Sequence, residues 1–236
     1  MKIWGYWATL GWAIIAFLAG QLAGSSVLLW QRAGEWSSLL ETPYDGILVT
    51  LFIAISNPAT IAVIMLAVWF AHSDQADYLA LKRPQRRDVI IGVVCLVGLI
   101  AICDALLYLS GRELVTQFQL QSYTTAAAEG WLIPMWLGAV IVAPAGEEIM
   151  FRGFLFRGWA HTERAVWPAV IVISALWAAL HVQYDWTGVA QIFVIGLFLG
   201  WMRWRSGSTL LTFFLHALFN LEGTMETVAQ IHFFAK

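Results

Sequence analysis

Six polar or ionisable residues lie inside apolar stretches in the second half of the chain, and their types could support hydrolysis. They are Glu147, Glu148, Arg152, His181, His216 and Asn220. Lipid cannot satisfy polar groups, so ionisable residues in membrane helices usually face a bundle interior or a watery cavity. A carboxylate in a dry pocket can take a proton from water, while imidazole and amide groups can stabilise an oxyanion. The set therefore predicts water activation and hydrolysis of an acyl compound.

The two glutamates are expected to have different roles. Glu148 and Arg152 are four residues apart, so they share a helix face and can pair as structural support. Glu147 lies about 100° further round the helix and is left free for chemistry. Pro144 and Gly146 should kink or loosen the helix just where the acids begin.

Two further helices are expected to complete the site. His216 and Asn220 are four residues apart and could both donate to one bound oxygen. His181 comes from a separate apolar stretch. Asp185, four residues after it, could orient the His181 imidazole or could be a solvated residue at the helix end.

A second group of acids lies outside this set. Asp104 is inside an apolar stretch, so it should be neutral or have a partner, which the sequence does not identify. Glu222 and Glu226 lie four residues apart near the outer end of the last stretch, where we expect them to be solvated or interfacial.

Composition requires a membrane environment for the elements that carry these residues. The chain has 60% hydrophobic and 12% charged residues, whereas globular domains have roughly half and a quarter. The predicted fold is all-α, a polytopic transmembrane helix bundle of about seven spans, or eight. Its apolar stretches cover about 5–30, 45–71, 88–109, 131–158, 166–184, 188–203 and 208–228.

The chain is expected to divide into two parts with a defined orientation. Residues 1–129 would be an N-terminal scaffold of three spans and an extracytoplasmic connection, and residues 130–236 the catalytic core. The short basic loop at residues 82–87 indicates a cytoplasmic N-terminus in a bacterial inner membrane. The net charge of −2, with no basic stripe, argues against a nucleic-acid partner.

Three segments resemble the motifs of a known family of intramembrane proteases. Glu147-Glu148-Ile-Met-Phe-Arg152, Trp177-Ala-Ala-Leu-His181 and His216-Ala-Leu-Phe-Asn220 are similar to the EExxxR, FxxxH and HxxxN or HxxxD motifs of the CAAX prenyl protease and bacteriocin-processing (CPBP, or Abi) family. The resemblance covers roughly residues 130–222. It departs at Trp177, where the family usually has phenylalanine, and the larger ring could narrow the substrate groove.

The resemblance implies a role for each matching residue. Glu147 and His181 would activate a water, His216 and Asn220 would form an oxyanion site, and Glu148 with Arg152 would support the structure. It also implies a glutamate protease without a metal or other cofactor. The substrate would be a membrane-embedded or lipidated, CAAX-like, peptide or protein.

The same residues also fit roles other than metal-free proteolysis. The polar side chains could satisfy one another as contacts between helices, without catalysis. Glu147, His181 and His216 could bind zinc, although the sequence has no His-Glu-x-x-His segment. The chain could also be a non-proteolytic membrane scaffold, or a bacteriocin-immunity or regulatory protein.

Overall fold

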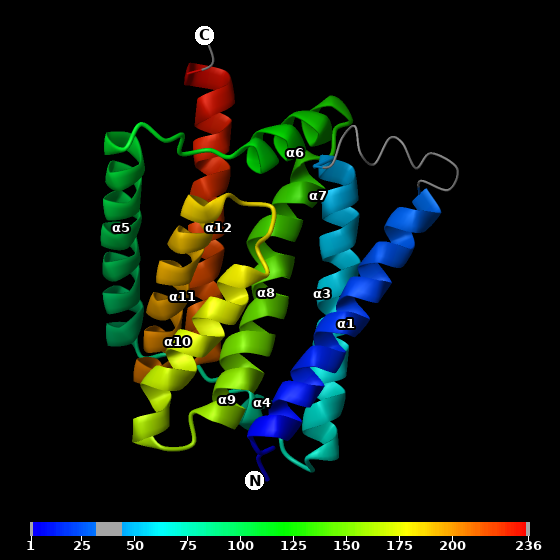
Figure 1. The fold of residues 1–236 in the computed structure, drawn as a ribbon, viewed down its shortest axis with the longest axis vertical. Coiled ribbons are helices and arrows are strands. Elements are labelled where there is room, and N and C mark those ends of the chain that lie inside the picture. The colour runs from blue at the N-terminus through cyan, green and yellow to red at the C-terminus, as the bar shows by residue number, and fades with distance from the viewer. Residues whose placement is uncertain (1, 32–43, 235–236) are drawn as a thin grey trace.

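The computed structural model describes residues 2–31 and 44–234, which form helices without any strand (Figure 1). The predicted all-α class is therefore confirmed. The long helices are α1 (Tyr6–Gln31), α3 (Gly46–Phe70), α5 (Arg86–Leu109), α10 (Glu163–Ala179), α11 (Trp186–Ser206) and α12 (Thr209–Ala229). The helices α4 (Gln75–Tyr78) and α6 (Gln117–Ala128) are shorter, and α12 continues into a π-helical turn, η3 (Gln230–Phe234).

A continuous helical rod runs through the middle of the bundle from Leu132 to Trp159. It consists of α7 (Leu132–Leu137), the π-helical segment η1 (Gly138–Val142), α8 (Ala143–Glu148), the π-helical segment η2 (Ile149–Leu155) and α9 (Phe156–Trp159). Wide turns thus flank α8 on both sides, where the sequence predicts a kink or loosening. Such π-helical turns are rare and are often found at functional sites.

Five helices among the described residues are long and apolar enough to cross a membrane. They are Tyr6–Val27 within α1, then α3, α5, the central rod and α11. The seven expected stretches each coincide with a helix, but length and composition alone do not qualify α10 and α12 as spans. At 17 residues α10 is about 25 Å long, and α12 carries His216, Asn220 and two glutamates.

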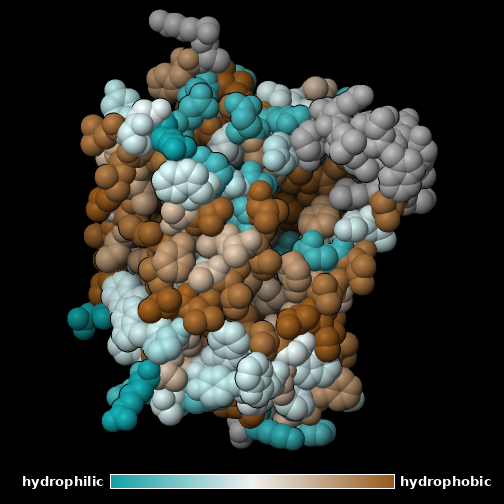
Figure 2. Space-filling view, viewed as in Figure 1, coloured by the Kyte–Doolittle hydropathy of each residue, from teal (hydrophilic) through white to brown (hydrophobic). Residues whose placement is uncertain are grey.

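The surface has the character expected of a protein embedded in lipid. On the face shown in Figure 2, apolar residues lie mainly across the middle of the bundle, with polar residues towards both ends. On α5, Ile90, Val94, Val97, Ile102 and Leu106 are each between 56% and 66% exposed. Exposed apolar surface of this extent marks a contact with lipid or protein.

Side-chain caps fix the helix ends that determine where the site residues lie. Asp185 is the N-cap of α11 and Ser208 is the N-cap of α12. Between these helices Gly207 adopts a left-handed conformation with φ 64°, which glycine allows at no steric cost. The N-terminus, α4 and α9 lie at one end of the bundle, while α6 lies across the other (Figure 1).

Candidate active site

The central rod approaches α3 closely where it carries the two glutamates. A Cβ atom on Gly146 would overlap the amide oxygen of Asn57 and would lie 2.8 Å from Asn57 Cβ. Glycine therefore allows α3 to support the rod one residue before Glu147. The Asn57 amide also donates to its own helix, from Nδ2 to the carbonyl of Ile53 over 3.2 Å.

Glu147 lies among three aromatic side chains from two other helices. Its Oε2 accepts a hydrogen bond of 2.5 Å from the indole Nε1 of Trp177. The same oxygen lies 4.0 Å from His181 Nε2 and 4.0 Å from His216 Nε2. The Glu147 side chain is 25% exposed, so water can reach it. The structure thus brings together Glu147, His181 and His216, which the sequence places on three separate helices.

The backbone sets the orientation of the His181 ring. Its Nδ1 lies 2.8 Å from the carbonyl oxygen of Trp177, one turn earlier. A carbonyl can only accept, so Nδ1 carries the hydrogen and the neutral ring presents the lone pair of Nε2 towards Glu147. A distance of 4.0 Å between two acceptors is too long for a direct bond but suits a shared water.

Glu148 and Arg152 form the predicted pair at the centre of the bundle. Arg152 Nη1 donates to Glu148 Oε1 over 2.8 Å, and the two side chains are 1% and 0% exposed. Arg152 Nη2 also donates to the carbonyl of Gly196 on α11 over 3.3 Å. The same Glu148 oxygen lies 2.9 Å from His216 Nδ1. Glu148 therefore contacts both the arginine and one site histidine.

Asn220 lies one turn after His216 and is bonded to the first wide turn of the rod. Its Nδ2 donates to the carbonyl of Ala139, within η1, over 2.8 Å. An amide nitrogen has two hydrogens, so one remains for another acceptor.

The structure contradicts the orienting role considered for Asp185. Its Oδ1 accepts from the Thr187 hydroxyl over 2.6 Å and from the Gly188 amide over 2.9 Å. Its Oδ2 pairs with Arg112 Nη1 at 3.1 Å. These bonds, led by the one from Thr187, lower the pKa of Asp185 below its ordinary value. The carboxylate caps α11, and the Trp177 carbonyl orients His181 instead.

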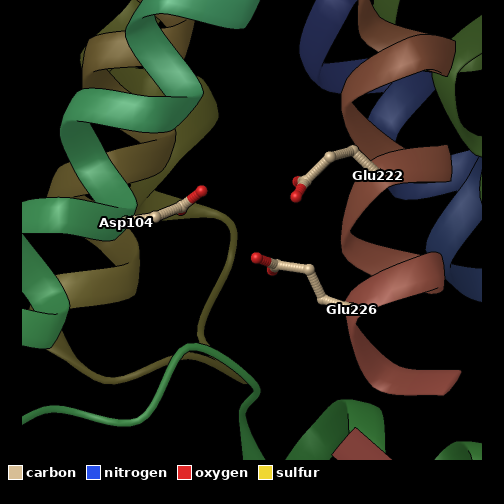
Figure 3. A group of neighbouring side chains, drawn as sticks. All are labelled: Asp104, Glu222 and Glu226. Atoms are coloured by element: carbon tan, nitrogen blue, oxygen red, sulfur yellow. The ribbon is translucent and has the colours of Figure 1, made fainter. Parts of the chain in front are cut away.

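The second group of acids is brought together by the fold. Asp104 on α5 points towards Glu222 and Glu226 on α12 (Figure 3), and the nearest carboxylate oxygens lie within 4.8 Å of one another. All three residues are partly buried. Glu222 and Glu226 also line the cavity of the site, and their proximity to Asp104 is a contact that the sequence did not indicate. The neighbours of Asp104 are two like charges, which repel it when ionised.

Two contacts at the site go beyond what the sequence indicates. The indole of Trp177 is expected there only as added bulk, yet its N–H binds Glu147. Arg203 is 5% exposed, and its Nε donates over 3.0 Å to the carbonyl of Arg152 within the second wide turn. The sequence feature that could have indicated the Arg203 contact is an arginine near the end of an apolar stretch, because such residues usually pair with another polar group.

A cavity of about 620 Å³ contains the site. Its wall includes Glu147 of the rod, His181 just after the end of α10, and His216 and Asn220 of α12. Side chains of α1 and α3 close another part of it, including Phe17, Gln21, Phe52 and Asn57. A cavity of this size and mixed lining can hold several residues of a peptide, since ligand sites commonly measure about 300–1,000 Å³.

Comparisons with known proteins agree with the three motifs. Residues 129–221 match the model of the Type II CAAX prenyl endopeptidase Rce1-like family. An Escherichia coli protein described as an uncharacterized 24.3 kDa protein is 30% identical over 136 residues, which are 53% of this chain. The chain spans 60% of the length of that relative. No solved structure matches the chain. The region that matches this family model thus carries all three motifs, in agreement with the resemblance seen in the sequence.

Proposed function

We propose that this chain is an intramembrane endopeptidase that hydrolyses a peptide bond in a membrane-embedded or lipidated, CAAX-like, peptide or protein. One observation carries the proposal: Glu147 Oε2 lies 4.0 Å from a ring nitrogen of both His181 and His216, inside a cavity large enough for a peptide. The match of residues 129–221 to a family of CAAX-type endopeptidases supports it.

The first step is attack by water. A water held between Glu147 and the acceptor nitrogen of His181 gives a proton to the Glu147 carboxylate, and its oxygen bonds to the scissile carbonyl carbon. The carbonyl oxygen becomes an oxyanion, which the free amide hydrogen of Asn220 and Nε2–H of His216 stabilise. His216 can donate there only when both ring nitrogens are protonated, because Nδ1 already faces Glu148. Glu148 is the counter-charge for that imidazolium.

The second step is collapse of the tetrahedral intermediate. The oxyanion reforms the carbonyl, the carbon–nitrogen bond breaks, and the proton held by Glu147 passes to the leaving nitrogen. The products are a carboxylic acid and an amine, and Glu147 is again ionised.

The proposal includes a membrane topology. The helices α10 and α12 would cross the bilayer with the five apolar helices, giving seven spans, with residues 1–129 as scaffold and 130–236 as catalytic core. The basic residues at the end that holds the N-terminus would face the cytoplasm of a bacterial cell, within its inner membrane.

The test is a comparison of the unaltered protein with Glu147→Gln. Membrane peptides from cells that carry each form are compared by mass spectrometry, and each purified protein is assayed in nanodiscs on a farnesylated CAAX-type peptide. Glu163→Gln is the control, because Glu163 is an exposed residue in the first turn of α10. We expect Glu147→Gln to abolish cleavage and Glu163→Gln to retain it.

Two results would contradict this proposal. If Glu147→Gln changes no membrane peptide and leaves cleavage intact, the chain is a scaffold, immunity or regulatory protein. Stoichiometric zinc in the purified protein, together with chelator-sensitive cleavage, would replace the metal-free mechanism by zinc bound to Glu147, His181 and His216.

A further inference from the structure

The Trp177 side chain contacts charged and titratable side chains of the site. The residue is 1% exposed, and its indole N–H donates to Glu147 Oε2 over 2.5 Å. The Arg152 guanidinium lies over its ring at 4.5 Å from the centroid. The rings of His181 and His216 each meet it edge to face, with centroids 5.1 Å apart.

We propose that Trp177 is a positioning residue, whose indole N–H fixes the Glu147 carboxylate for water activation. This inference rests on the proposed function of Glu147. The role of Trp177 then depends on the hydrogen of its indole N–H and not on the volume of its ring.

The direction of the hydrogen bond follows from the chemistry of the two groups. An indole nitrogen is only a donor and an ionised carboxylate is only an acceptor, so the indole donates and Glu147 Oε2 accepts. Oε2 is thereby held by a donor, on a side chain that is 25% exposed and within reach of water, while the hydrogen bonds of the described residues include none to Oε1. One carboxylate oxygen is fixed and the other remains available to a water.

The packing around Trp177 makes the donor rigid. Gly196 on α11 lies against the indole, since a Cβ there would be 3.1 Å from Trp177 Cε3. The Arg152 guanidinium over the ring and the two imidazoles in edge-to-face contact with it restrict the indole further. A side chain held on these sides loses little entropy when it binds the carboxylate, so the bond preorganises the base.

Several other charged or titratable groups also lie near Glu147. Arg152 comes from its own rod, His181 from the end of α10, His216 from α12 and Tyr184 from the connection before α11. Glu148 lies beside it in the chain, paired with Arg152. A change at Trp177 that leaves these groups in place therefore isolates the contribution of the indole N–H.

The experiment removes the donor in two ways. Trp177→Phe removes the N–H and part of the ring, while replacement of Trp177 by 3-benzothienyl-alanine keeps the ring volume and removes only the N–H. Trp167→Phe is the matched control, because Trp167 lies on the same helix, is 49% exposed and packs on Trp204 outside the site. All forms are purified in nanodiscs, and kcat and KM are measured on the farnesylated CAAX-type peptide.

We expect both Trp177 variants to lower kcat by about 10- to 100-fold, the effect of one hydrogen bond to a charged group. KM should change little, because the indole does not hold the substrate. Trp167→Phe should match the unaltered protein in both quantities.

The outcomes separate this inference from the proposed function. If Glu147→Gln abolishes cleavage but the benzothienyl variant keeps the kcat of the unaltered protein, Trp177 is packing only and this inference is wrong. If cleavage survives Glu147→Gln, or the unaltered protein cleaves nothing, the proposed function fails and the inference fails with it. A variant that raises KM alone would assign Trp177 to substrate binding instead.

Discussion

Glu148 and His216 are joined by a hydrogen bond of 2.9 Å between Oε1 and Nδ1, and both side chains are almost fully buried. The carboxylate can only accept, so the bond fixes the hydrogen on Nδ1 and turns Nε2 towards Glu147. Glu148 therefore supports the site in two ways, because it neutralises Arg152 and orients the histidine.

Replacing Glu148 by glutamine should destabilise the protein much more than the same change at Glu147. Arg152 would be left in the interior without its counter-charge, which typically costs about 3–5 kcal/mol. The Glu147 side chain is 25% exposed and has no ion pair within 4.0 Å, among the described residues, other than those with the histidines, so its neutral form should fold normally. Thermal unfolding in detergent measures both changes, with Glu163→Gln as the control. Equal stability of the two glutamine variants would contradict the supporting role of Glu148.

Gly146→Ala should destabilise the contact between the central rod and α3. The added methyl group would overlap the Asn57 amide, and overpacking of this kind typically costs about 1–3 kcal/mol. Gly98→Ala is the control, since nothing lies within 4 Å of a Cβ at that position on α5. The double variant with Asn57→Ala should recover part of the loss in thermal unfolding. If the double variant is no more stable than Gly146→Ala, Asn57 is not the residue that limits the space.

Asp185→Ala should lower stability modestly and leave catalysis almost unchanged. The change removes the N-cap of α11 and the ion pair with Arg112, and loss of a cap typically costs about 1 kcal/mol. A loss of kcat as large as that of a His181 variant would instead support an orienting role for Asp185.

The stabilisation that Asp185 provides should decrease towards acid pH. Its pKa is lowered in the folded state, chiefly by the hydrogen bond from Thr187. The stabilisation is therefore present above the ordinary aspartate pKa of about 3.9, and it is lost as the pH falls through the lower folded value. The stability difference between the unaltered protein and Asp185→Ala should shrink towards acid pH, and a constant difference would contradict this linkage.

Much of the fold and of the site could be predicted because lipid limits the choices. Apolar runs of about 20 residues can only be helices, so each expected stretch from 5–30 to 208–228 coincides with a helix of the structure. The i,i+4 spacing likewise predicts the pair of Glu148 with Arg152, which forms.

Other contacts depend on how helices meet, which no local pattern encodes. Asp104 faces Glu222 and Glu226 because α5 packs beside α12, and these residues are more than 100 positions apart in the sequence. Asp185 lies four residues after His181, the spacing at which two residues share one face of a helix. However, α10 ends at Ala179, so His181 and Asp185 do not lie on a common helix, and Asp185 binds Thr187 instead.

The sequence by itself determined a membrane helix bundle and the six polar residues of the candidate site, since composition and residue spacing are local properties. Only the tertiary structure decided that the Trp177 indole binds Glu147 and that Glu148 orients His216. Those bonds depend on the rotation and approach of three helices, which the packing of small residues such as Gly146 and Gly196 sets.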